Sequence, residues 1–157
     1  MKAKIHVYLK DSINTDEIIP ARYLNSDKEE ELAKHAMEDL DKGFAKKAKK
    51  GDFIVAGKDF GCGSSREHAI WALRGAGIKG VIAESFARIF YRNAINNGFL
   101  AIECREIDKN LKSGDIIELS LEKGFFTVKD RKYRFTPIPE FVKEIMEKGG
   151  LLKRLTT

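Results

Sequence analysis

Hydrophobic and polar residues follow two different periods along this chain, and the two periods alternate. Residues 1–8 alternate between polar and apolar side chains, which is typical of a strand with one buried face. Short apolar runs bounded by turn residues predict buried strands at 53–56, 80–83 and 99–103. The stretches between them predict helices, each followed by a nearby glycine, at 28–40, 65–74 and 84–96. Strands that alternate with helices favour a sheet with parallel strand pairs.

Beyond residue 115 the pattern changes to short strands joined by tight turns. These strands are predicted at 116–121, 125–128 and 133–135, and they form an antiparallel meander. A last amphipathic helix follows Pro137-Ile138-Pro139 and extends to about Lys148, before Gly149-Gly150. Residues 11–20 are polar and end in a proline, so they predict a loop.

These elements predict one α/β domain over residues 1–157, with a mixed sheet that has a parallel βαβ centre and an antiparallel C-terminal meander. The hydrophobic fraction of 43% and the charged fraction of 34% are typical of a soluble globular protein. The N-terminal alternation contains no long apolar run, so we expect neither a signal peptide nor a membrane anchor. We therefore predict a cytoplasmic protein.

The net charge of +5 permits attraction to nucleic acid, to anionic metabolites or to an acidic partner subunit. The densest basic run, Lys46-Lys47-Ala48-Lys49-Lys50, has no interleaved aromatic residues that could stack on bases. We interpret this run as the solvated end of a helix, where cations complement the helix dipole. We expect no nucleic-acid partner.

The strongest candidate for chemistry is the glycine-rich segment 57–68. Ser64, Ser65 and Arg66 stand at a predicted helix start, where unpaired backbone N–H groups favour an anion and arginine can bind a carboxylate bidentately. Ser64 and Glu67 also fit a capping box, in which each side chain satisfies the other's backbone donor. A cap leaves the second hydroxyl, the arginine and the glycines unexplained, so we favour a site that binds and deprotonates an anion. Thr15 and Asp16 belong either to the same pocket or to an ordinary turn.

Better-known motifs do not fit segment 57–68. A dinucleotide fingerprint and a nucleophile elbow both need a glycine where Arg66 stands, and a P-loop needs a Gly-Lys-Ser/Thr ending that is absent. His68 lies one helical turn after Ser64, where it could act as its base, but no third residue is evident to orient it. We assign His68 to local packing, and Arg88 and residues 91–98 mostly to capping and packing.

The two cysteines, Cys62 and Cys104, are far apart in sequence. An iron–sulfur cluster ordinarily needs three or four thiolates, so this chain cannot hold one unaided. Cys62 is either a small packing residue or a ligand.

Three segments closely resemble the small subunit of 3-isopropylmalate dehydratase, in the aconitase superfamily: Asn14-Thr15-Asp16, Gly57 to His68, and Ser85 to Asn93. The likeness covers nearly the whole chain, and its Gly-x-Gly-Ser-Ser-Arg-Glu core is specific. The resemblance implies the swivelling β/β/α domain, which in aconitase is fused to the cluster-bearing domains and here would be a separate polypeptide.

By this resemblance Ser64 is the base that removes a proton next to a carboxylate, and Ser65 and Arg66 bind substrate oxygens. We also expect Thr15 and Asp16 among the substrate-binding residues. The leaving hydroxyl needs a Lewis acid, so a 4Fe-4S cluster is expected in a large subunit. The implied reaction converts 2-isopropylmalate, a small dicarboxylate, into 3-isopropylmalate by dehydration and rehydration in leucine biosynthesis. We expect a hetero-oligomer in which this chain is inactive alone, and self-association of the isolated chain stays open.

The resemblance also implies that a loop selects the substrate, here Tyr23-Leu24-Asn25-Ser26-Asp27-Lys28. Relatives that accept a third carboxylate tend to place an arginine there. This loop has none, so an apolar branch is favoured, because an unpaired buried carboxylate is costly. Lys28 could reach an anion, so the small subunit of a homoaconitase, a methylmalate dehydratase or a 2,3-dimethylmalate dehydratase stays open, as does a non-catalytic anion-binding or regulatory module.

Overall fold

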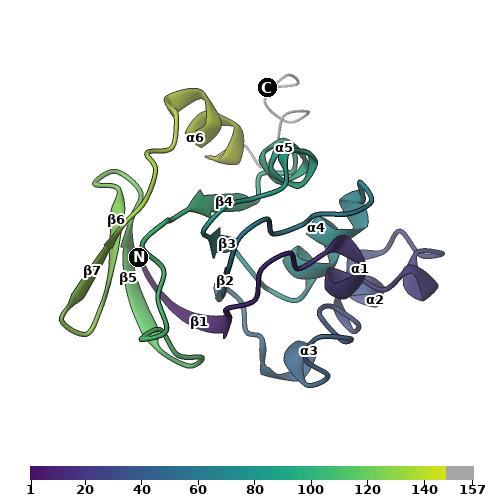
Figure 1. Ribbon diagram of the computed structural model, residues 1–157. Helices are drawn as coiled ribbons and strands as arrows, with labels where there is room; N and C mark the ends of the chain where they lie inside the picture. The colour runs from purple at the N-terminus through teal and green to yellow at the C-terminus, as the bar shows by residue number, and fades with distance from the viewer. Residues whose placement is uncertain (148–157) are drawn as a thin grey trace.

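The computed structural model describes residues 1–147, which are built around a seven-stranded mixed sheet (Figure 1). Across the sheet the strands follow the order β4-β3-β2-β1-β5-β6-β7. Their bounds are β1 Lys2–Tyr8, β2 Phe53–Ala56, β3 Gly80–Ala83, β4 Leu100–Glu103, β5 Ile116–Ser120, β6 Phe125–Val128 and β7 Arg131–Arg134. Neighbours from β1 to β4 are parallel, whereas β1, β5, β6 and β7 pair antiparallel. The predicted combination of a parallel centre with an antiparallel C-terminal meander is confirmed.

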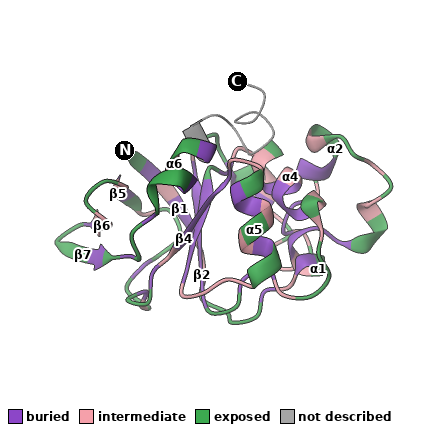
Figure 2. Cartoon of the chain, turned by 90° about the horizontal axis from the view of Figure 1, so that it is seen from above, coloured by how far each residue is buried: buried purple, intermediate pink, exposed green. Residues whose placement is uncertain are grey.

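Helices connect the parallel strands, and most of them lie on one side of these strands (Figure 1). Their bounds are α1 Thr15–Ile18, α2 Glu29–Ala33, α3 Phe44–Lys47, α4 Glu67–Gly75, α5 Arg88–Asn96 and α6 Glu140–Glu147, with a 3₁₀ turn, η1, at Ala21–Tyr23. Both faces of the parallel strands are covered, so β2 and β3 are buried at every residue. Figure 2 shows this burial concentrated along the central strands.

The alternation of side chains along β2 divides the apolar residues into two cores. Ile54 and Ala56 belong to the core beneath α2, α4 and α5. Phe53 and Val55 point to the opposite face and belong to the core that includes β5, β6, β7 and α6. The strand that carries the glycine-rich segment is therefore fixed from both sides.

The predicted continuous helix over 28–40 is wrong, because α2 ends at Ala33. The backbone of Met37 adopts a left-handed conformation with φ of 58°, and its N–H donates to the Ile18 carbonyl at 2.8 Å. The Met37 side chain is fully buried. Tertiary packing against α1 thus interrupts a pattern that is helical by spacing alone. Gly43, expected to end this helix, is instead the residue before α3.

Other differences lie at the ends of elements. The loop predicted over 11–20 contains α1, which Asn14 and Glu17 begin with a capping box. Helix α4 begins at Glu67 and α5 at Arg88, both later than predicted. The glycine pair expected after α6, Gly149-Gly150, lies outside the described residues.

The basic run is as expected, since Lys46 and Lys47 lie in the last turn of α3. Within residues 1–147, no helix has both the length and the apolar character that crossing a membrane requires. The cytoplasmic location stays a prediction from the sequence.

Candidate active site

The glycine-rich segment is held in place by the segment that directly follows β1. The Gly61 N–H donates to the Ile13 carbonyl at 2.8 Å, and the Thr15 N–H donates to the Cys62 carbonyl at 2.9 Å. These bonds continue the parallel pairing of β1 with β2 beyond the ends of both strands. Because parallel strands end at the same edge of a sheet, segments distant in sequence meet there.

The same segment is also paired to the chain that follows β3. The Phe60 N–H donates to the Ser85 carbonyl at 3.1 Å, and the Ala87 N–H donates to the Phe60 carbonyl at 3.0 Å. Segment 60–62 therefore lies between the segment that follows β1 and the segment that follows β3. This second pairing brings the start of α5 beside it.

Two glycines are needed for this path. Gly61 and Gly63 have φ of 85° and 93°, which residues with side chains rarely adopt. A Cβ at Gly61 would lie 2.3 Å from Cγ of Phe90, a buried ring that packs edge-on against Phe60. At Gly63 the nearest atoms would be 3.5 Å away, so only its backbone conformation demands glycine.

Ser64 is not a helix cap. Helix α4 begins at Glu67, its N-cap is Arg66, and no side chain caps it. The Ser64 residue is exposed, and its hydroxyl makes no hydrogen bond within residues 1–147. Its carbonyl instead accepts the hydroxyl proton of Thr15 at 2.9 Å, and Thr15 is only 3% exposed. The capping alternative is therefore excluded, and the Ser64 hydroxyl is available for chemistry.

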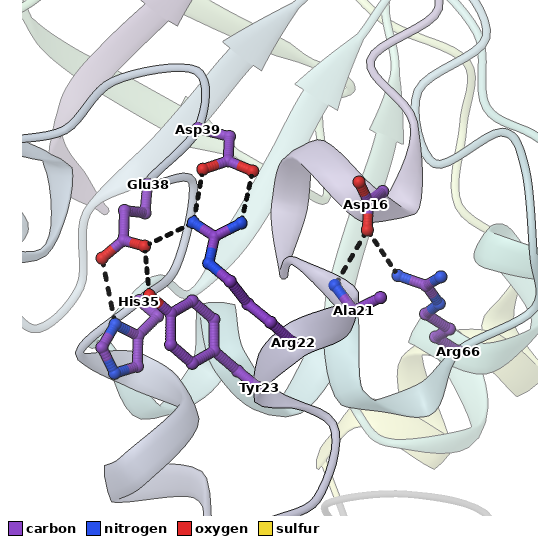
Figure 3. A network of polar contacts seen from close by, with 8 residues as sticks. All are labelled: Asp16, Ala21, Arg22, Tyr23, His35, Glu38, Asp39 and Arg66. Atoms are coloured by element: carbon purple, nitrogen blue, oxygen red, sulfur yellow. Dashed lines mark hydrogen bonds and ion pairs between the residues drawn. The ribbon is translucent and has the colours of Figure 1, made fainter.

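Arg66 is anchored on the side of α1 (Figure 3). Its Nη1 donates to the Asp16 carboxylate and to the Ile19 carbonyl, both at 3.3 Å. The Ala21 backbone N–H, and after it Arg66, lower the pKa of Asp16 below its usual value. Both bonds use one nitrogen, so the rest of the guanidinium makes no hydrogen bond within residues 1–147.

A cavity of about 490 Å³ opens over this segment. Four of the predicted site residues line it, namely Thr15, Ser64, Ser65 and Arg66. Asp16 does not line the cavity but bonds to Arg66, which does. The cavity wall also contains Asp59 and three polar residues of α5 that the sequence analysis assigned to capping and packing: Arg88, Arg92 and Asn93. The sequence could have indicated these three residues. Helix α5 follows the strand next to β2, and because the two strands are parallel the helix must begin at the same edge of the sheet as the glycine-rich segment.

His68 and Cys62 do not line this cavity. One ring nitrogen of His68 lies 3.1 Å from the Asp27 carboxylate, and the ring packs beside Trp71. Burial, and after it the charge of Asp59, raise the pKa of the Cys62 thiol.

The loop 23–28 is also absent from the cavity wall, but it is anchored at both ends. At its start the Tyr23 ring stacks on His35 at 3.7 Å, and the Tyr23 hydroxyl donates to Glu38 at 2.6 Å (Figure 3). At its other end Asp27 meets His68 on α4. Its role in substrate choice stays a prediction.

Comparison with known proteins places this geometry in a family. Residues 2–107 match the model of the aconitase C-terminal domain. 3-isopropylmalate dehydratase small subunit 2 of Deinococcus radiodurans is 55% identical over 153 residues, which are 95% of this chain and 73% of that protein. The small subunit from Caldicellulosiruptor saccharolyticus is 53% identical over 154 residues, which are 97% of this chain and 88% of that protein.

The chain belongs to the family of 3-isopropylmalate dehydratase small subunits. A solved member of this family, 3-isopropylmalate dehydratase (leuD) from Methanocaldococcus jannaschii, superposes with a TM-score of 0.91 at 45% identity. That match covers 99% of this chain and 92% of the other. The family resemblance and the fold that it implies are confirmed, whereas the roles of individual site residues stay predictions.

Gly61→Ala is expected to destabilise the isolated chain by roughly 2 kcal/mol or more, because it combines a left-handed residue with a clash against Phe90. Gly114→Ala is the matched control, because Gly114 has φ of 96° but nothing within 4 Å of a Cβ. Urea unfolding of both variants measures the difference. Equal losses of unfolding free energy would contradict the close approach to Phe90.

Glu38 gives a prediction about pH. Hydrogen bonds from His35 and Tyr23 lower the pKa of its carboxyl from 4.5 to about 2. Because the pKa of Glu38 is lower in the folded state than in the unfolded chain, the ionised carboxylate stabilises the fold at pH values above 4.5. This contribution to the free energy of unfolding is lost as the pH falls from 4.5 towards 2. An NMR titration of the Glu38 carboxyl carbon measures the midpoint. A midpoint near 4.5 would show that this anchor of the loop 23–28 does not form in solution.

Proposed function

We propose that this chain is the small subunit of a 3-isopropylmalate dehydratase, one aconitase-type swivel domain that supplies half of an active site. The complex isomerises 2-isopropylmalate to 3-isopropylmalate by dehydration and rehydration in leucine biosynthesis. One observation carries the assignment of chemistry to this chain: the unbonded Ser64 hydroxyl stands on a cavity that Ser65 and Arg66 also line.

Ser64 is proposed as the base that removes the proton next to a substrate carboxylate. A serine hydroxyl is a weak base in water, so the site must stabilise its alkoxide. The backbone amides of Ser64 and Ser65 make no hydrogen bond within residues 1–147, and three arginines line the cavity. These amides and cations are the groups that would hold negative charge at the Ser64 oxygen.

Ser65 and Arg66 are proposed to bind a substrate carboxylate. Arg66 reaches Asp16 and Ile19 through Nη1 alone, which leaves its other donors for a ligand. Thr15 acts below the surface, because its hydroxyl donates to the Ser64 carbonyl rather than to the cavity. Thr15 and Asp16 are therefore proposed to position Ser64 and Arg66, respectively.

Departure of the substrate hydroxyl needs an electrophile, which residues 1–147 do not provide. Within residues 1–147, no three His, Cys, Asp or Glu side chains are placed to hold a metal ion together. Cys104 is buried, and burial raises the pKa of its thiol to about 11. The residues present do not fit a 4Fe-4S cluster, which we assign to a large partner subunit, where it would act as a Lewis acid.

Ser64→Ala tests the proposed base in a complex reconstituted anaerobically with a large subunit. The expected result is a loss of kcat of roughly 100-fold or more, because general-base catalysis contributes about 10²- to 10⁴-fold. Subunit assembly is expected to be unchanged, because the Ser64 hydroxyl is exposed and makes no hydrogen bond within residues 1–147. Ser12→Ala is the matched control, because Ser12 is exposed, lies outside the cavity wall and also has a hydroxyl without a hydrogen bond within residues 1–147.

Unchanged turnover of Ser64→Ala would remove Ser64 from the chemistry. An unmutated complex that turns over homoaconitate, methylmalate or dimethylmalate but not 2-isopropylmalate would keep the reaction class and overturn the substrate.

A further inference from the structure

Two arginines on α5, Arg88 and Arg92, line the cavity and have no polar partner in the described part of the chain. Arg88 is the first residue of α5 and Arg92 lies one turn later, and both are exposed. Neither side chain makes a hydrogen bond or an ion pair within residues 1–147. Two other arginines are paired in this structure, Arg22 with Asp39 and Arg74 with Glu29.

Their position is unfavourable for the helix alone. Like charges four residues apart repel, by about 0.2–0.5 kcal/mol in isolated helices. A cation at a helix N-terminus also opposes the helix dipole, and the first turn of α5 has no acidic residue to compensate. Nothing in the folding of α5 calls for Arg88 and Arg92, whereas an anion in the cavity would relieve both costs.

The net charge of the cavity wall indicates the charge of the ligand that it can bind. Arg66, Arg88 and Arg92 line it with only one carboxylate, that of Asp59, so its wall carries two net positive charges. Arg66 already shares part of its charge with Asp16. Among the three cations that line the cavity, Arg88 and Arg92 are therefore the two without an ion-pair partner within residues 1–147. A dicarboxylate carries two negative charges at neutral pH and matches this wall.

We propose that Arg88 and Arg92 bind one carboxylate of the substrate while Ser65 and Arg66 bind the other. This inference rests on the proposed function and adds residues that the sequence analysis had assigned to capping and packing. The two groups come from different parent strands, since α4 follows β2 and α5 follows β3. A dicarboxylate would bridge the starts of the two helices across the cavity, with the Ser64 hydroxyl on the same wall.

Acidic side chains of a large subunit are the competing partner for these arginines. Arg88 and Arg92 also line a smaller adjacent hollow of about 250 Å³, together with Glu103. We favour the substrate because the same two residues share the larger cavity with Ser64, Ser65 and Arg66. The experiment below separates the two partners.

The test uses the reconstituted complex and the variants Arg88→Gln, Arg92→Gln and the double variant. Loss of a charge-assisted bond to a carboxylate is expected to raise KM for 2-isopropylmalate by about 10- to 100-fold per arginine. The Lys variants should recover part of this loss, because they keep the charge but not the bidentate geometry. Arg134→Gln is the matched control, an exposed arginine on β7 at the opposite edge of the sheet.

Inhibition by succinate and by butyrate gives a readout that a merely structural role would not change. The unmutated complex should be inhibited more strongly by succinate, a dicarboxylate, than by butyrate, a monocarboxylate. The double variant should lose most of this difference in inhibition. Weaker subunit association with an unchanged KM at saturating large subunit would show that the arginines bind the partner, and would overturn the proposal. Unchanged KM and unchanged succinate preference would overturn it as well. Absence of turnover in the unmutated complex would instead refute the proposed function.

Discussion

The site depends on the backbone pairing between the chain after β1 and the glycine-rich segment after β2. Gly61 donates to Ile13, Thr15 donates to Cys62, and the buried Thr15 hydroxyl donates to the carbonyl of Ser64. Because these bonds fix the backbone from 61 to 64, the Ser64 side chain needs no bond of its own. The exposed hydroxyl that we propose as the base then has a rigid backbone support.

The charge of the cavity wall is the second feature on which the proposed site depends. The cavity wall contains three arginines, a single carboxylate and the amides of Ser64 and Ser65, which have no hydrogen-bond partner within residues 1–147. The described residues leave part of this positive charge uncompensated, as is expected where a ligand supplies the missing negative charge. Within residues 1–147 no side chains are grouped to hold a metal ion. Both observations support the proposal that this chain supplies an anion-binding base and that a large subunit supplies the metal.

Local patterns predicted much of this molecule. The buried strands were predictable because apolar runs end at turn residues, and Ser64 and Arg66 were predictable because glycines precede them. The break at Met37 was not, since it arises from a contact with α1 that no local spacing encodes. Arg88 and Arg92 were missed for a similar reason. The sequence pattern shows only that both residues belong to a helix. The parallel pairing of β2 and β3 is what brings them to the cavity.

Amide hydrogen exchange of the isolated chain, followed by NMR, measures whether this backbone pairing holds the site rigid. We expect the amides of Gly61 and Thr15 to exchange slowly, like those of the parallel strands, because each donates to a neighbouring segment of the sheet edge. The amides of Ser64 and Ser65, which have no partner within residues 1–147, should exchange rapidly. Rapid exchange at Gly61 and Thr15 as well would contradict the account, because the serine would then have no fixed support.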